Sequence, residues 1–123
     1  MKIKSIIYWV ITSLISIMML FSAYSYLTNP MMKEGFVHLG FPGYFRVELA
    51  IAKILGAIAL LVPFIPAKIK EFAYVGFSIT FISAFIAHTS SGDPMSVAIF
   101  PIIALVLLMV SHIYYLKIFN DKR

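Results

Sequence analysis

The chain has 123 residues, of which 62% are apolar or aromatic and 12% are charged, against about a quarter charged in a typical soluble domain. A chain this short has too little interior to bury so much apolar surface, so the composition excludes a water-soluble globular domain and predicts a single unit in a lipid bilayer. The net charge of +5 accompanies no nucleic-acid-binding motif, and the absence of cysteine excludes thiol chemistry and cysteine-ligated metal centres.

Four apolar segments follow one another along the chain, at about residues 6–27, 44–62, 72–88 and 97–116. Each has about 17–22 residues, which is enough for a helix to cross a hydrocarbon core of about 30 Å. The first segment is longer than the apolar region of a cleaved signal peptide, so we expect it to remain as a span. The sequence therefore predicts an all-α polytopic membrane protein, a bundle of four transmembrane helices that forms one domain over residues 1–123.

Turn-forming residues separate the four predicted helices. Asn29-Pro30 is predicted to end the first helix, and residues 40–43 precede the second. Pro63 and Pro66 separate the second helix from the third, and residues 90–94 separate the third from the fourth.

Lysine and arginine lie mostly on one side of the predicted membrane, and cytoplasmic segments are usually the ones enriched in these residues. The opposite side holds only Lys33 and Arg46. The enriched side holds Lys2, Lys4, Lys68, Lys70, Lys117, Lys122 and Arg123. We therefore expect both termini in the cytoplasm and the segments 28–45 and 89–96 on the outer face.

Small side chains form stripes along the predicted helices, which is typical of surfaces where membrane helices pack closely. The clearest stripes contain Gly56 on the second helix and Gly76, Thr80, Ser83, Ala84 and Ala87 on the third. Weaker stripes on the first and fourth helices contain Ser5, Thr12, Ser16 and Ala23, and Pro101, Ala104, Ser111 and Tyr115. We interpret these stripes as packing surfaces.

The second helix carries Arg46, Glu48 and Lys53 on the side that holds its small residues. An ionisable residue near the centre of a bilayer costs about 2.5–3.5 kcal/mol on insertion scales. Arg46 and Glu48 are close enough to the helix end to reach the interface, whereas Lys53 needs a partner or a hydrated cavity. Because residues two and five apart do not face each other on a helix, we expect Glu48 to pair with a cation on another helix.

The predicted topology brings these charges to the outer half of the bundle, together with His38, His88 and Asp93. We therefore predict an outward-opening polar pocket between helices, with the candidate residues Arg46, Glu48, Lys53, His88, Asp93 and His38. The same residues are also compatible with purely structural ion pairs and helix caps. No metal site is expected because His38 and His88 lack a clustered third ligand, and His112 lies too far from His88 to share a haem.

No nucleotide-binding, metalloprotease or hydrolase motif is present, so the sequence identifies no catalytic residue and favours a protein that is not an enzyme on its own.

Two blocks of residues resemble the DoxX-like family of small four-helix membrane proteins. The first runs from Leu39 through Arg46, Glu48, Lys53 and Ala57 to Pro63, and the second runs from Lys70 to Phe77, with His88 and Asp93 following it. The resemblance covers most of the chain. It implies a bacterial-type cytoplasmic (inner) membrane, with Glu48, Lys53 and His88 at the polar positions of the family.

The resemblance leaves three functions open. The first is a non-enzymatic accessory or binding protein that holds a small lipophilic ligand, such as a quinone or a lipid, or a partner subunit at the outer pocket; a homo-oligomer is the alternative to a partner subunit. The second is the membrane subunit of a quinone-linked redox complex, with quinone as the one cofactor implied. A stand-alone sulfur-redox role does not fit a chain without cysteine. The third is a small oligomeric transporter that uses Glu48 and Lys53.

Overall fold

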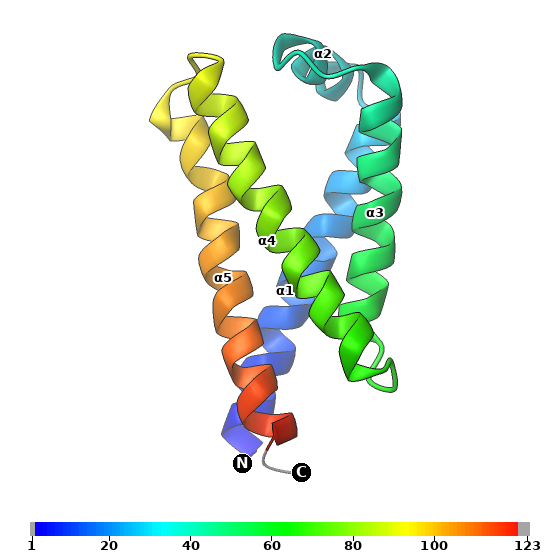
Figure 1. Cartoon of the computed structure of the whole chain (residues 1–123), viewed down its shortest axis with the longest axis vertical. Helices are drawn as coiled ribbons and strands as arrows, with labels where there is room; N and C mark the ends of the chain where they lie inside the picture. The colour runs from blue at the N-terminus through cyan, green and yellow to red at the C-terminus, as the bar shows by residue number, and fades with distance from the viewer. Residues whose placement is uncertain (1, 121–123) are drawn as a thin grey trace.

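The structure, a computed structural model, describes residues 2–120, which form five α-helices (Figure 1). The all-α prediction is confirmed. Along the chain the helices are α1 (Lys2–Thr28), α2 (Pro30–His38), α3 (Gly43–Leu61), α4 (Ala67–Ser90) and α5 (Met95–Asn120).

The four long helices run up and down, so that their connections alternate between two ends of the molecule (Figure 1). The terminus end holds the start of α1, the end of α5 and the connection between α3 and α4. The α2 end holds α2 and the connection between α4 and α5. Three connections join the long helices: α1 to α3 and α4 to α5 at the α2 end, and α3 to α4 at the terminus end. All three lie where the sequence predicts them.

The short helix α2 occupies a segment that the sequence analysis treats as a loop, and this expectation was wrong. The Asn29 side-chain oxygen accepts a hydrogen bond from the Met31 amide at 2.9 Å, and Pro30 takes the first helical position. An N-cap asparagine followed by proline begins a helix, because the side chain satisfies a free amide and proline has no amide to satisfy. The Asn29-Pro30 pair therefore both ends α1 and starts α2.

Three helices are long and apolar enough to cross a membrane, namely those over Ile3–Thr28, Ala67–Ser90 and Met95–Ile118. They belong to α1, α4 and α5. The remaining long helix, α3, has 19 residues and carries Arg46, Glu48 and Lys53, so its composition alone does not place it in the same class. The four predicted spans are therefore supported for three helices.

The terminus half of the molecule is the packed half. Tyr8, Leu60, Tyr74 and Leu108 are almost completely buried there and belong to one apolar core that joins all four long helices. Gly56 of α3 lies against the ring of Phe77 on α4, and a Cβ atom added to Gly56 would come within 2.6 Å of that ring. The missing side chain therefore allows α3 and α4 to approach closely at this level.

Hydrogen bonds between buried hydroxyls connect three helices within this core. Ser111 Oγ lies 2.6 Å from Thr12 Oγ1 and 2.7 Å from the Tyr74 hydroxyl, which links α5 to α1 and α4. Thr12 and Ser111 are fully buried, so their predicted position on inward-facing surfaces is confirmed. Buried hydroxyls need such partners because no water reaches them.

Toward the α2 end, α4 diverges from α3 and lies beside α5 (Figure 1). The helices α1 and α3 remain together on one side, and α4 and α5 remain together on the other. The two pairs are therefore splayed toward the α2 end, and α2 lies over this end as a roof.

Candidate functional site

A cavity of about 800 Å³ lies between the splayed helix pairs. All five helices contribute to its lining, which is mainly apolar and aromatic. Small-molecule sites typically have volumes of about 300–1,000 Å³ and the same combination of an apolar lining with a few polar groups. The cavity is therefore the best candidate for a binding site among the described residues.

The roof of the cavity is built from aromatic side chains beneath α2. Phe36 is the buried residue of α2, and its ring lies 4.8 Å from that of Tyr26, edge to face. Phe41 and Phe45 follow in the next segment, with their ring centres also 4.8 Å apart. These rings anchor α2 to α1 and α3 but not to α4 or α5.

The small residues of α4 line the cavity instead of filling a contact between helices. Thr80, Ser83, Ala84 and Ala87 all face it. Gly76 is exposed, with open space around it. Of the small residues predicted for packing, Gly56 of α3 therefore makes the close helix contact. The small residues of α4 after Gly76 instead leave the volume that the cavity occupies.

Lys53 is the charged residue of the cavity wall. The residue is 6% exposed, and its ammonium donates hydrogen bonds to Ser22 Oγ at 2.9 Å and to the Tyr26 hydroxyl at 2.6 Å. The ammonium also lies 4.1 Å from the centre of the Tyr26 ring, where the π electrons attract a cation. Ser22 and Tyr26 are four residues apart and therefore share one face of α1.

Arg46 precedes Lys53 on α3, closer to the α2 end, and contacts the same tyrosine, Tyr26. Its Nη1 donates to the Tyr26 carbonyl oxygen, and its Nε is buried without a hydrogen-bond partner among the described residues. Two cations of α3 therefore flank Tyr26.

Glu48 does not take the predicted place in this cluster. The buried face of α3 contains Ala50, Lys53, Ala57 and Leu60, spaced three or four residues apart, and Glu48 points away from it. Its side chain is exposed, and no ion pair joins it to another described residue. The interhelical cation expected for Glu48 is therefore not observed, and the sequence analysis placed it on the wrong face of the helix.

His38, Asp93 and His88 form a bridge between α2 and the connection that joins α4 to α5 at the α2 end. His38 Nε2 lies 2.9 Å from one oxygen of Asp93, and His88 Nδ1 lies 2.7 Å from the other. Hydrogen bonds from His88 and then from His38 hold the pKa of the Asp93 carboxyl below its ordinary value. A carboxylate only accepts hydrogen bonds, so each ring donates to it at neutral pH.

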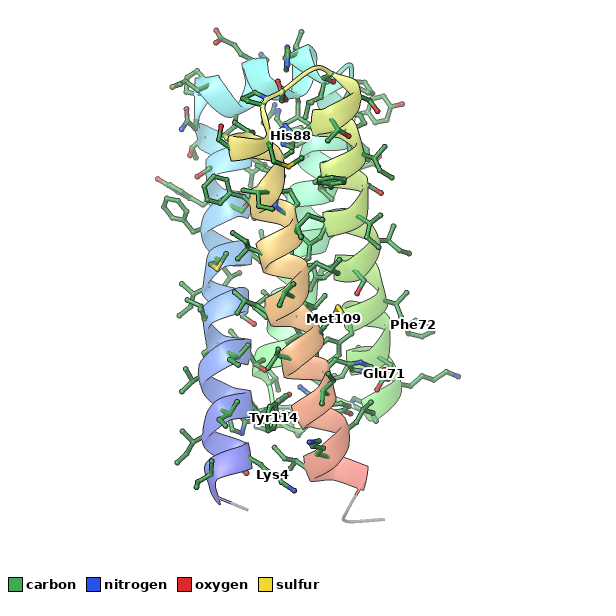
Figure 2. The ribbon with its side chains drawn as sticks, turned by 90° about the vertical axis from the view of Figure 1, so that its left-hand side faces the viewer. Lys4, Glu71, Phe72, His88, Met109 and Tyr114 are labelled. Atoms are coloured by element: carbon green, nitrogen blue, oxygen red, sulfur yellow. The ribbon has the colours of Figure 1, made fainter. Side chains whose placement is uncertain are left out.

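His38 and His88 also line the cavity, and Figure 2 shows His88 just beneath the α2 end. Each imidazole is directed at a separate oxygen of Asp93, so the bridge is a pair of hydrogen bonds and not a shared coordination sphere. The described residues contain no group of three ligands that could hold a metal ion.

Several polar contacts were missed from the sequence. Ser22 is the clearest, although its spacing of four residues from Tyr26 was visible. His112 is another: its Nε2 lies 2.8 Å from Glu71 Oε1 in the terminus half of the molecule, where Figure 2 shows Glu71. A contact between residues 41 positions apart follows from helix packing, which no local pattern reveals.

A model of the DoxX-like family matches residues 10–111 of the chain, which covers α3, α4, most of α1 and α5, and all the residues that line the cavity. The chain belongs to the DoxX-like family. No curated protein and no solved structure matches it significantly. Family membership and the three long apolar helices together identify this DoxX-like protein as a membrane protein.

Proposed function

We propose that this DoxX-like protein is a binding protein of the membrane, without an enzymatic activity of its own, that holds a small lipophilic ligand in the cavity at its α2 end. The observation that carries this proposal is the combination of an apolar cavity of about 800 Å³ with one buried ammonium in its wall. An apolar body fits the lining, and Lys53 with its hydroxyl partners orients a polar head. Arg46 supports this head site by fixing Tyr26.

The occupant can be identified by purifying the protein in native lipid particles and analysing everything that accompanies it by mass spectrometry. A lipophilic small molecule should be retained. The variant Ala84→Phe places a ring in the cavity and should reduce the retained amount about tenfold, because the ring takes the space of the ligand. The same substitution at exposed Ile86, two residues along α4, serves as the control and should retain the ligand.

A purified protein with nothing lipophilic bound, or equal retention by both variants, would contradict the proposal. If a protein partner or a second copy of the chain is retained instead, the accessory role would consist of binding that protein at an interface.

A quinone-linked redox role is a second candidate, favoured by one observation. His88 faces the cavity while its Nδ1 is hydrogen-bonded to Asp93, which leaves the second ring nitrogen as a proton acceptor. A histidine oriented by a carboxylate is a common general base, so it suits removal of a proton from a bound quinol. Retention of a quinone in the experiment above would favour this role.

We also propose that α3 is a fourth span in a bacterial-type inner membrane, with both termini in the cytoplasm. The support is that α3 runs antiparallel to α1 and lies beside it toward the α2 end (Figure 1), together with the burial of Lys53 against Ser22 and Tyr26, which removes the ammonium from lipid. Lys4, Lys68 and Lys117 lie at the terminus end, as expected for cytoplasmic segments.

Single cysteines can test this orientation directly, because the natural chain has none. In intact cells, a membrane-impermeant maleimide should label Lys33→Cys on α2 but not Phe64→Cys in the connection between α3 and α4. Both positions are exposed, so both should react once the membrane is permeabilised. Labelling of Phe64→Cys in intact cells would invert the topology, and labelling of both would remove α3 from the membrane.

A further inference from the structure

The hydrogen-bonding capacity around Lys53 restricts the head group that the cavity accepts. An ammonium has three N–H donors and no acceptor, and the described residues use two of the three, on Ser22 and Tyr26. Each of these hydroxyls accepts from the ammonium, and its own proton makes no other hydrogen bond within residues 2–120. The site therefore offers three donors: one N–H and two O–H groups.

No negative charge among the described residues balances this site. Among the residues that line the cavity, Lys53 is the only lysine, arginine, aspartate or glutamate. Asp93 is engaged by two histidines, and Glu48 is exposed on another face of α3. Arg46, beside Tyr26, adds a second positive charge. A buried cation without a counter-charge is costly, and an anion that enters the cavity removes that cost.

A carboxylate matches the site in both respects, because it is negatively charged and accepts hydrogen bonds without donating any. The opposite wall, formed by α4 and α5, presents Phe81, Phe100 and Ala104 and suits an apolar chain. We propose that the ligand is an amphiphile with a carboxylate head, in the manner of a fatty acid, whose head binds Lys53, Ser22 and Tyr26 while its chain lies against α4 and α5. This inference rests on the proposed binding function and names the ligand class.

A series of ligands that differ only in the head group tests the inference on the unmodified protein. Equilibrium binding of labelled palmitate to the purified protein in nonionic detergent should be displaced by unlabelled palmitate. Hexadecanol, which keeps the chain and lacks the charge, should bind about tenfold or more weakly, since hydrogen bonds to a charged group are worth about 1.5–3 kcal/mol. Hexadecylamine, whose head repeats the charge of Lys53, should bind more weakly still.

Two lysine variants complete the test. Lys53→Met keeps the length of the side chain and removes its charge, and it should weaken palmitate binding by about tenfold while hexadecanol binding stays within about twofold. Lys33→Met, at an exposed lysine of α2, is the matched control and should leave both unchanged.

The outcomes separate the two proposals. Hexadecanol or a decyl-quinone binding as tightly as palmitate would overturn the carboxylate assignment and leave the binding function intact. Failure of every amphiphile to bind would overturn the binding function itself. If Lys53→Met does not fold, the head-group series on the natural protein still decides the question.

Discussion

Replacing Lys70 with methionine should destabilise the protein by about 2–3 kcal/mol, the largest stability effect we expect from a single side chain outside the apolar core. Lys70 is 2% exposed, and its ammonium donates to the carbonyl oxygens of Ala59 at 2.8 Å and Leu60 at 3.1 Å. Both carbonyls belong to the last turn of α3. The Ala59 carbonyl would ordinarily bond to the amide of residue 63, but that residue is proline and has no N–H. The lysine of α4 replaces the missing donor.

Methionine fills the same space and leaves both carbonyls without this partner inside the protein. Unfolding in mixed micelles, followed by circular dichroism, measures the loss. Lys68→Met, at an exposed lysine two residues earlier on the same helix, should change stability by less than about 0.5 kcal/mol. Equal effects of the two substitutions would show that Lys70 does not cap α3.

Replacing Asp93 with alanine should release α2 from α4 and α5. The described contacts of α2 with the α4–α5 pair depend on this carboxylate, which holds His38 on one oxygen and His88 on the other. Spin labels at Lys33→Cys and Ser90→Cys, both exposed positions, would report the distance between α2 and the end of α4. A narrow distance distribution should become broad when Asp93 is removed. His38→Ala should broaden it similarly, and the two substitutions together should add little.

The bridge should also open in acid. The pKa of Asp93 is lower in the folded protein than its ordinary value of 3.8, so the bridge contributes fully to stability above that value. Its contribution is lost as the pH falls below 3.8 and through the lower folded pKa. The distance distribution of the natural Asp93 protein should therefore broaden only in that acid range, and that of Asp93→Ala should already be broad at neutral pH. Broadening that begins near neutral pH would assign the contact to another group.

The helical class and the four long segments followed from apolar length alone, because a bilayer imposes that length on any spanning helix. The structure extended the third segment from residue 72 back to Ala67, since Pro66 can precede a helix and Lys68 and Lys70 continue it. Apolar length carries no information about α2. That helix is specified by the Asn29 cap and by Pro30, which the sequence analysis used only as a stop signal.

The candidate site was predictable in part. Lys53, His38, His88 and Asp93 do lie toward one end of the molecule, as topology required. The prediction for Glu48 was wrong because the small residues of this helix cover a wide arc of its surface. Only packing against α1 decides which part of that arc is buried. The cavity itself could not be predicted from the sequence. Small residues on α4 read as a packing surface, and the divergence of α4 from α3 turned most of them into the wall of an open volume.

The placement of Lys53 has a consequence for the biogenesis of the protein. Its hydroxyl partners and the contact of Arg46 with Tyr26 all lie within residues 22–53, which belong to the first two long helices. During synthesis this hairpin emerges from the ribosome before α4 and α5. The hydroxyls that hydrogen-bond the Lys53 ammonium belong to the same hairpin. The later hairpin, whose helices are joined by the hydrogen bond between Tyr74 and Ser111, then contacts the first hairpin through the hydrogen bond between Ser111 and Thr12 of α1. With α3 as the fourth span that we propose, the first hairpin would enter the membrane with Lys53 already hydrogen-bonded, before α4 and α5 are translated.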